Sequence, residues 1–496
     1  MRQMLRVAQQ GVEPLTDEVM RLAMRKAASD FDDRHGGFGL QPKFPQPMTY
    51  EFLLRHYLRT EDADALHMVE LTLQRMAMGG IYDQIGGGFH RYSTDTFWLV
   101  PHFEKMLYDN ALLVRLYLHA YQITGNPMYS RIVEETLEYV TREMTSPEYK
   151  PEALGDEDGE IFCRYYGVTT HGNFEGRNIL RVAMDAANLA REEGLDASGF
   201  GELLNRSRAK LLEVRNERIA PALDDKILTS WNGLMLAAFA EAAAVLGRRD
   251  YAEIAERNAE FLLTNLLRDG RLLRTYKDGR AKLNGYLEDY AFMIDGLLAL
   301  HEVNFSRDTL DAAIRLGNAM VELFWDAASG QFFDTGHDHE ELVVRPKDVT
   351  DNAIPCGSSM AVDVLLRLAV ITGDGDMERR ASTALRSMRQ LMMTFPTAAG
   401  HWLGALDFYL SRAKEIVIVG ERGDSGTDAL LAEAYRHYIP NRVLLGASGG
   451  ETEANGLPLL ADRRKVDGLP TAYLCENYVC QLPVTDPMAF ARQLVD

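Results

Sequence analysis

One short stretch of the sequence, residues 98–110, holds the densest group of side chains that could do chemistry. A neutral histidine can act as a base near pH 7, and carboxylates beside it can move protons. If a helix begins near Phe103, residues three or four positions apart share its first turns. We therefore take His102, Glu104 and Asp109 as candidate catalytic residues; a capped helix start is the competing interpretation. The candidate ligand-binding residues of this stretch are Lys105, Tyr108 and Asn110.

A run of three glycines precedes this stretch and leads into His90 and Arg91. Consecutive glycines let the backbone bend sharply or approach a ligand closely. His90 and Arg91 are therefore candidate binding residues, and a tight surface turn is the alternative.

A second polar segment, residues 224–233, contains two adjacent aspartates. Neighbouring carboxylates repel each other unless a cation or a ligand offsets their charge. We take Asp225 as a candidate catalytic residue and Lys226 as a binding residue. Trp231 offers a flat face on which a sugar could stack, and Asn232 lies beside it. The alternative is a helix capped by Asn232 with Trp231 in the core.

Two further polar segments precede apolar helical stretches. Glu288 and Asp289 are candidate catalytic residues, and the binding candidates here are Tyr290, Lys347, Asp351 and Asn352. Carboxylates at a helix N-terminus can simply complement the helix dipole. That explanation accounts for one carboxylate per helix, but not for so many carboxylates, lysines and aromatic residues together.

A repeat connects these polar segments. Four times, a small polar residue lies fifteen positions before a glycine or asparagine, as in Asn110–Gly125, Asn232–Gly247, Asp289–Asn304 and Ser358–Gly373. The polar residue suits a helix N-cap, and glycine or asparagine suits the left-handed residue after a helix. The spacing therefore predicts four helices of about four turns each.

The pattern of apolar residues predicts helical hairpins. The first helix of each pair is apolar nearly all round, and the second is amphipathic. The predicted first helices span 106–124, 233–246, 290–303 and 360–372, and the second helices span 128–144, 251–267, 309–325 and 377–392. Further helices are predicted at 16–31, 48–59, 63–78, 179–193 and 200–213. Buried first helices and half-exposed second helices predict a mainly α fold, an (α/α)₆ toroid over residues 1–409. The polar helix starts would then meet at one face of the ring.

Residues 410–496 differ in pattern and predict a small α/β segment packed on the barrel. Its strands are expected at 414–420, 442–446 and 472–484, with a helix at 427–437. Cys475 and Cys480 are five positions apart, so on a straight strand they would point to opposite faces, and we expect no disulfide between them. His337 and His339 could share a strand face, but no third ligand is apparent. We therefore expect no metal site and no cofactor.

Bulk properties exclude several classes of protein. The net charge is −20, which argues against nucleic acid and anionic membranes as partners. Apolar residues make up 46% of the chain, enough for a large core. No apolar stretch reaches the roughly 18 residues of a membrane span, and residues 1–14 have no apolar signal region. We expect a soluble, cytoplasmic protein.

From about Leu15 onward the sequence closely resembles the YyaL-like, spermatogenesis-associated thioredoxin-domain proteins. The resemblance is carried by the motifs GGGFHRYSTDTFWLVPHFEKMLYDNALL, LDDKILTSWNGLMLAAFAEA, GYLEDYAFMIDGLLAL, VRPKDVTDNAIPCGSSMAVDVLLRLA and TAYLCENYVCQLPVTDP. It implies a six-hairpin glycosidase-like toroid, similar to N-acylglucosamine 2-epimerases, cellobiose epimerases and unsaturated glucuronyl hydrolases. Members usually begin with a thioredoxin-like domain, which is absent here, so the chain would be a fragment and that domain a partner. A shortened loop at residues 145–152 is the second departure from the family pattern.

Three functions are consistent with these features. The first is sugar isomerisation or 2-epimerisation of a small sugar-like ligand, with His102, Glu104 and Glu288 as bases and Arg91, Lys105 and Lys226 as stabilisers of an enolate. The similar epimerases are expected to place a histidine on each of two facing inner helices, and here only His102, with His90 nearby, lies in a comparable motif. The second is glycoside hydrolysis or hydration by paired carboxylates from Asp109, Asp225, Glu288 and Asp289. The third is a non-catalytic binding or quality-control module. An enzyme is favoured.

Overall fold

The computed structural model describes residues 13–144, 158–340, 344–448, 456–477 and 479–495. In these residues, six helices form an inner ring: α3 (Pro47–Thr60), α5 (Leu107–Thr124), α10 (Thr229–Leu246), α12 (Leu287–Asn304), α14 (Gly357–Thr372) and α16 (Gly400–Leu410). Each packs on the next, and α16 packs back on α3, so the ring is closed. The prediction of an (α/α)₆ toroid is confirmed.

Six outer helices alternate with the inner ones along the chain: α2 (Asp17–Asp30), α4 (Ala63–Met78), α6 (Pro127–Glu143), α11 (Arg249–Asn265), α13 (Arg307–Phe324) and α15 (Gly375–Thr394). Their apolar faces pack on the ring, as the amphipathic pattern predicts. The short inner helix α16 was not predicted. Short strands join some of the helices: β1 (Tyr92–Ser93), β2 (Pro101–His102), β3 (Ile227–Leu228), β4 (Leu267–Arg268), β5 (Arg271–Lys277), β6 (Arg280–Asn284), β7 (Trp325–Asp326) and β8 (Gln331–Phe332).

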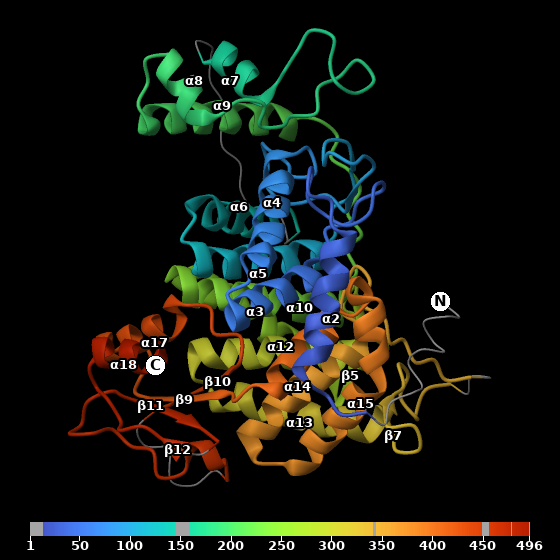
Figure 1. Ribbon diagram of the computed structural model, residues 1–496, viewed down its shortest axis with the longest axis vertical. Helices are drawn as coiled ribbons and strands as arrows, with labels where there is room; N and C mark the ends of the chain where they lie inside the picture. Colours follow the sequence, from blue (N-terminus) through green and yellow to red (C-terminus); the bar gives the residue numbers. More distant parts are fainter. Residues whose placement is uncertain (1–12, 145–157, 341–343, 449–455, 478, 496) are drawn as a thin grey trace.

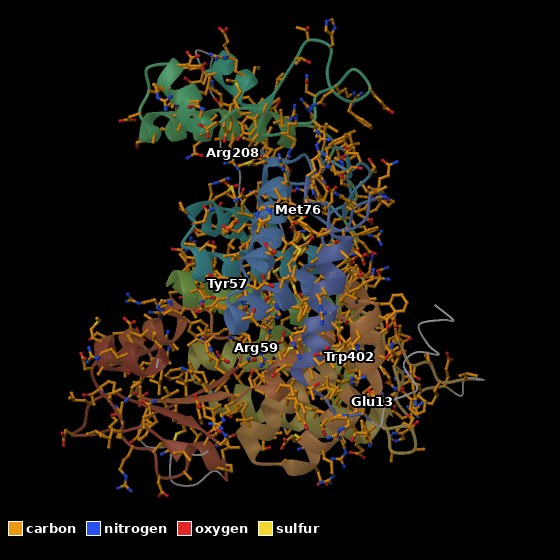
Figure 2. The ribbon with its side chains drawn as sticks, in the orientation of Figure 1. Glu13, Tyr57, Arg59, Met76, Arg208 and Trp402 are labelled. Carbon is orange, nitrogen blue, oxygen red and sulfur yellow. A yellow bond between two sulfur atoms is a disulfide. The ribbon has the colours of Figure 1, made fainter. Side chains whose placement is uncertain are left out.

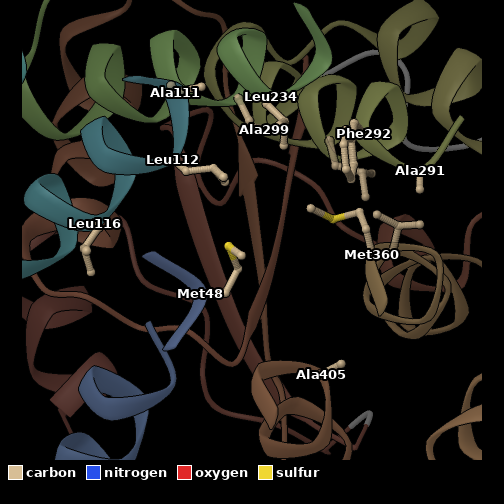
Figure 3. Close-up of a cluster of buried hydrophobic side chains, with 14 of the residues drawn as sticks. Met48, Ala111, Leu112, Leu116, Leu234, Ala291, Phe292, Ala299, Met360 and Ala405 are labelled. Atoms are coloured by element: carbon tan, nitrogen blue, oxygen red, sulfur yellow. The ribbon is translucent and has the colours of Figure 1, made fainter. Parts of the chain in front are cut away.

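The inner helices are apolar on most sides because they are covered both by the outer layer and by one another. Figure 3 shows side chains from all six inner helices meeting around the ring, among them Met48, Leu112 and Met360. The inner helices α10 and α12 approach each other closely. A Cβ atom at Gly233 would lie 2.7 Å from the backbone of Phe292, so only glycine allows this distance between the helices.

The predicted helix ends are partly right. Gly125, Gly247 and Gly373 follow their helices with positive φ angles of 69°, 66° and 73°, as expected. In the third repeat the left-handed residue is Phe305 rather than Asn304, which is still helical.

The polar residues expected as N-caps lie instead within the first turns of the helices, so that prediction is wrong. The observed N-caps are Met106, Leu228, Tyr286 and Cys356. The reason is visible at Asn110, whose side-chain oxygen accepts a hydrogen bond from the Phe89 backbone at 2.7 Å. The side chain holds a neighbouring loop and does not cap its own helix.

Three helices form an excursion between α6 and α10: α7 (Gly159–Tyr166), α8 (Ala186–Glu192) and α9 (Ala197–Asn216). They lie together at the top of Figure 1, around a small apolar core of their own. The predicted helix 179–193 is present only from Ala186, because Asp185 caps it and residues 179–185 are not helical. Arg208 lies on the side of α9 that faces the ring (Figure 2) and bonds to Glu135 at 2.7 Å.

The last part of the chain is an α/β segment, as predicted. Its sheet has the strand order β10–β9–β11–β12, formed by β9 (Lys414–Val419), β10 (Arg442–Ala447), β11 (Thr471–Glu476) and β12 (Val479–Cys480). Helices α17 (Ser425–Arg436) and α18 (Pro487–Val495) pack with it. That residues 410–496 form a domain separate from the ring stays a prediction.

One prediction in this segment is wrong: Cys475 and Cys480 form a disulfide. The chain reverses between them, so they are direct partners across the antiparallel β11–β12 hairpin and share a face. The expectation assumed one straight strand.

No helix in the described residues is long and apolar enough to cross a membrane.

Candidate functional site

A cavity of about 150 Å³ lies inside the ring. It is lined by side chains from all six inner helices and, at one side, by residues 435–442 of the C-terminal segment. At about 10–15 Å³ for each water, this volume holds roughly ten water molecules, which suits a small polar ligand.

Arg115 on α5 is the centre of a charged network in the cavity. Its guanidinium makes two hydrogen bonds to Glu241 on α10, at 2.6 and 3.0 Å, and one to Asp295 on α12 at 2.8 Å. Arg367 on α14 binds the other oxygen of Asp295 at 2.6 Å and lies 2.9 Å from Asp363. Charges buried in a protein are tolerated when they are paired in this way.

His119 lies one helical turn after Arg115 and is held between two carboxylates. Its Nδ1 is 2.7 Å from Glu51 on α3, and its Nε2 is 3.2 Å from Glu241. Because ionised carboxylates only accept hydrogen bonds, both ring nitrogens must carry protons. Burial alone would lower the pKa of His119, but the charges of Glu51 and Glu241 outweigh it and raise the pKa. His119 is therefore an imidazolium.

The C-terminal segment completes this wall. The Tyr438 ring stacks on His119 at 4.1 Å, and its hydroxyl donates to Glu51 at 3.1 Å. Tyr435 and Arg442 both donate to Glu302 on α12, at 2.5 and 3.2 Å. Burial raises the pKa of Glu302 despite the nearby Arg442.

His401, at the start of α16, is the second histidine that lines the cavity. Its Nε2 is buried and has no hydrogen-bond partner among the described residues. Its backbone N–H donates to Asp351 at 2.8 Å, which fixes the start of the helix. The cavity thus contains one histidine with both nitrogens occupied and one with an unengaged nitrogen.

The sequence-predicted residues before α5 lie together at the rim of the ring. His102 stacks on Tyr92 at 4.8 Å and lies 3.8 Å from Glu104, which also binds Arg91 at 3.0 Å. His90 donates from Nδ1 to the Phe103 carbonyl at 3.0 Å, and burial lowers the pKa of His90 to about 4.

Buried polar groups lie just before α5 and in its first turn. Lys105 binds Asp83 at 2.8 Å, and burial lowers the pKa of Lys105 in spite of that carboxylate. Asp109 is 3% exposed and its Oδ2 has no partner among the described residues. Burial raises the pKa of Asp109 well above its usual range, so the fold favours the protonated form of this carboxyl. Tyr108 contacts Trp231 edge-on at 4.9 Å.

A second buried carboxyl lies at the start of α12. Asp289 accepts hydrogen bonds from the backbone N–H of Ser230 at 2.9 Å and of Tyr286 at 2.8 Å. Arg274 binds both Asp289, at 3.1 Å, and Glu288, at 2.9 Å. Burial raises the pKa of Asp289 to about 6. Asp289 therefore links the first turns of α10 and α12.

The other predicted residues are dispersed. Asp225 and Lys226 are exposed and pair with Lys277 and Asp224. Asn232 donates a hydrogen bond to the backbone of Leu228, and the Tyr290 hydroxyl accepts one from Arg271. Lys347 forms an ion pair with Asp326. Asp351 is buried and accepts a hydrogen bond from Ser359, whereas Asn352 is exposed.

None of these predicted residues is among the described residues that line the cavity, and their role stays a prediction. The cavity residues had their own signal in the sequence. Three pairs of charged residues lie four positions apart within inner helices: Glu51 and Arg55, Arg115 and His119, and Asp363 and Arg367. Such spacing places both side chains on one face. Among the described residues, no group of three or more histidine, cysteine or acidic residues is arranged to hold a metal ion.

Comparison of the fold with solved structures gives several similar helical enzymes. A cellobiose 2-epimerase from Bacillus thermoamylovorans matches with a TM-score of 0.47 and 13% identity, over 74% of this chain and 85% of that one. A GH76 α-mannanase from Bacteroides thetaiotaomicron matches with a TM-score of 0.47 and 11% identity, over 79% and 95%. A D-mannose isomerase has a TM-score of 0.45 and 13% identity, over 75% and 84%.

Sequence comparison is more decisive. No family model matches the chain. Human spermatogenesis-associated protein 20 is 34% identical over 559 residues, which cover 99% of this chain and 71% of the human protein. The rat protein of the same name is 34% identical over 530 residues, 94% of this chain and 67% of its own length. At this identity and coverage, the chain belongs to the family of spermatogenesis-associated protein 20.

Proposed function

We propose that this chain is a sugar isomerase or 2-epimerase whose reaction takes place in the ring cavity. The observation that carries the proposal is the pair of histidines on α5 and α16, the two helices that flank α3. His401 offers an unengaged ring nitrogen, and His119 is held as an imidazolium. Proton transfer beside a carbonyl needs such a base and acid.

The remaining cavity groups suit the same chemistry. In the proposed reaction, His401 removes the proton from the carbon next to the carbonyl of an open-chain sugar. Arg115 and Arg367 contribute positive charge where the enolate oxygen develops. The proton then returns from His119 to the other face of the carbon, or to the neighbouring carbon for isomerisation. A small, hydroxyl-rich ligand fits both the volume and the polar lining.

Glycoside hydrolysis or hydration is the second candidate, and one observation favours it. Asp109 is a buried carboxyl whose pKa burial raises well above its usual range, and a raised pKa is the direction that a general acid for a leaving oxygen requires. Its site would be the rim, with His102, Glu104 and Asp289 around it. We propose these rim residues as a ligand-binding entrance in either case.

The test is exchange of a sugar C2 proton for deuterium. Aldoses and ketoses are incubated with the protein in D₂O and followed by NMR. We expect exchange with at least one sugar, and a fall of about a hundredfold or more in His401→Asn, because a general base contributes that much. The control is His67→Asn, which changes an exposed histidine on α4 and should leave exchange intact.

Ligand binding is measured on the same proteins by thermal shift, since a ligand that binds the folded state raises Tm. His401→Asn should retain the shift that the sugar causes. His102→Ala and Asp289→Ala test the rim, because unchanged binding in both would contradict its role as an entrance. Hydrolysis without deuterium exchange would favour the second candidate. Binding without turnover would favour a non-catalytic module, and the absence of both would contradict a sugar site.

A further inference from the structure

The disulfide in the C-terminal segment has an unusual charged neighbour. Cys475 and Cys480 are opposite each other in the β11–β12 hairpin. Cys475 is buried against the sheet, at 2% exposure, whereas Cys480 is exposed. An external thiolate can therefore reach the sulfur of Cys480 but not that of Cys475.

Arg463 lies against both sulfurs. Its Nη2 is 3.0 Å from Sγ of Cys480 and 3.4 Å from Sγ of Cys475. The guanidinium is held 4.9 Å from the centre of the Tyr473 ring, and Tyr473 comes two residues before Cys475 on the same face of β11. In the part of the chain that the structure describes, Arg463 forms no ion pair with a carboxylate.

An arginine without an acidic partner gains little from an uncharged disulfide. It gains much more from a thiolate, because a nearby cation stabilises the negative sulfur. The Arg463 guanidinium therefore lies where a negative charge, that of a cysteine thiolate, forms only when the disulfide is opened.

We propose that Cys475 and Cys480 form a thiol–disulfide exchange site for an external dithiol, with Arg463 stabilising the thiolate that leaves. This site is separate from the ring cavity, and the proposal does not depend on the sugar reaction.

The exchange has two balanced steps. A thiolate of the dithiol attacks Sγ of Cys480, the Cys475–Cys480 bond breaks, and Cys475 leaves as a thiolate beside Arg463. The second thiolate of the dithiol then attacks the dithiol sulfur that is bonded to Cys480. This attack releases Cys480 as a thiolate. The protein gains two electrons and, after protonation of both sulfurs, two protons. The dithiol becomes a cyclic disulfide, so it is the reductant.

The hairpin keeps the two sulfurs close after reduction. Glu476 pairs with Val479, Gln481 donates from its backbone to Leu474 at 2.9 Å, and Ala472 bridges Val484. These contacts do not need the disulfide. Cys475 therefore stays opposite Cys480 and can expel a monothiol from a mixed disulfide. Dithiols should open the site, while monothiols should leave it mostly closed.

The experiment uses the full chain, oxidised in air and then treated with dithiothreitol or with glutathione at pH 7. Newly exposed thiols are alkylated with iodoacetamide and located by mass spectrometry. We expect dithiothreitol to release Cys475 and Cys480 together, and glutathione to give only a minor adduct on Cys480.

Variants of Arg463 test the role of the charge. Arg463→Gln should slow the reaction with dithiothreitol by about fivefold, since a poorer leaving thiolate slows exchange. Arg463→Lys should retain most of the rate. The control is Arg464→Gln, which removes the adjacent exposed arginine and should have no effect.

Three results would overturn the proposal. The first is that Cys475 and Cys480 are both free in the air-oxidised protein. The second is that Arg463→Gln and Arg464→Gln react at the same rate. The third is that glutathione accumulates on Cys480, which would show that Cys475 is not aligned to expel it. Circular dichroism of each variant establishes that the segment is still folded.

Discussion

Glu241 is the residue whose loss should disturb the ring interior most. Its two oxygens hold Arg115 through paired hydrogen bonds at 2.6 and 3.0 Å, and one of them also faces His119 at 3.2 Å. Its side chain is only 16% exposed. Glu241→Gln keeps the shape of the side chain but removes the negative charge between two cations.

Breaking a buried ion pair costs about 3 kcal/mol or more, because the remaining charge is left without compensation. Unfolding entropy is about 2.1 cal/mol/K per residue, so 3 kcal/mol corresponds to a fall in Tm of roughly 3–4 °C for a cooperative unit of 400 residues. The matched control is Glu134→Gln on the surface of α6. Glu134 is 41% exposed and lies 3.5 Å from Arg248, and such a pair contributes less than about 1 kcal/mol.

The destabilisation should also depend on pH in a defined direction. The pKa of His119 is raised in the fold, so its contribution is fully present below its unfolded pKa of about 6.5 and is lost as the pH rises through the folded pKa. Without Glu241 that folded pKa is lower. The Tm difference between wild type and Glu241→Gln should therefore be largest near pH 6 and shrink toward alkaline pH.

The assay is thermal unfolding followed by circular dichroism between pH 6 and pH 9. The reasoning would be refuted if Glu241→Gln and Glu134→Gln had the same Tm. It would also be refuted if the Tm gap between wild type and Glu241→Gln stayed constant with pH, because His119 would then not be charged through Glu241.

Two further predictions concern the ring itself. Because burial raises the pKa of Asp109, the fold must keep a proton that the unfolded chain releases above about pH 4, so stability falls as the pH rises. Asp109→Asn should remove this loss, and wild-type and variant Tm curves that run parallel from pH 4 to pH 8 would contradict it. Gly233→Ala should destabilise the ring by about 1–3 kcal/mol in urea unfolding, because its Cβ would meet the Phe292 backbone at 2.7 Å. Gly201→Ala on α9, where the Cβ meets nothing within 4 Å, should instead be neutral or stabilising.

The ring was predictable because its signals are local. An apolar helix that ends at Gly125, Gly247 or Gly373 needs only the 3.6-residue period and the left-handed glycine to be recognised. The starts of the same helices were misplaced by up to four residues. Asn110 and Asp289 have side chains that suit an N-cap, but each binds the backbone of another segment, and only the folded chain brings that segment near.

The cavity was harder to predict, since its members come from six helices and the C-terminal segment. Arg115 and His119 could have been noticed as two charged residues in an apolar helix, and they share a face because they are four apart. The pairing itself could not be predicted, because Glu51, Glu241 and Asp295 come from three different helices and only the folded ring brings them to Arg115 and His119. The prediction about the disulfide was wrong for a similar reason. It assumed that Cys475 and Cys480 lie on one straight strand, but the chain reverses between them and places their side chains on the same face.

The charges of α3 have a consequence for how the protein is made. Glu51 faces His119 through one oxygen and accepts from Tyr438, 387 residues later, through the other, and Arg55 binds Asn441, 386 residues later. A ribosome must therefore synthesise the entire ring and the first part of the C-terminal segment before these two charges meet Tyr438 and Asn441. Until then water has to solvate the sides of Glu51 and Arg55 that these partners later cover. Completion of the interior is thus among the last events of biosynthesis, although α3 is among the first helices to emerge.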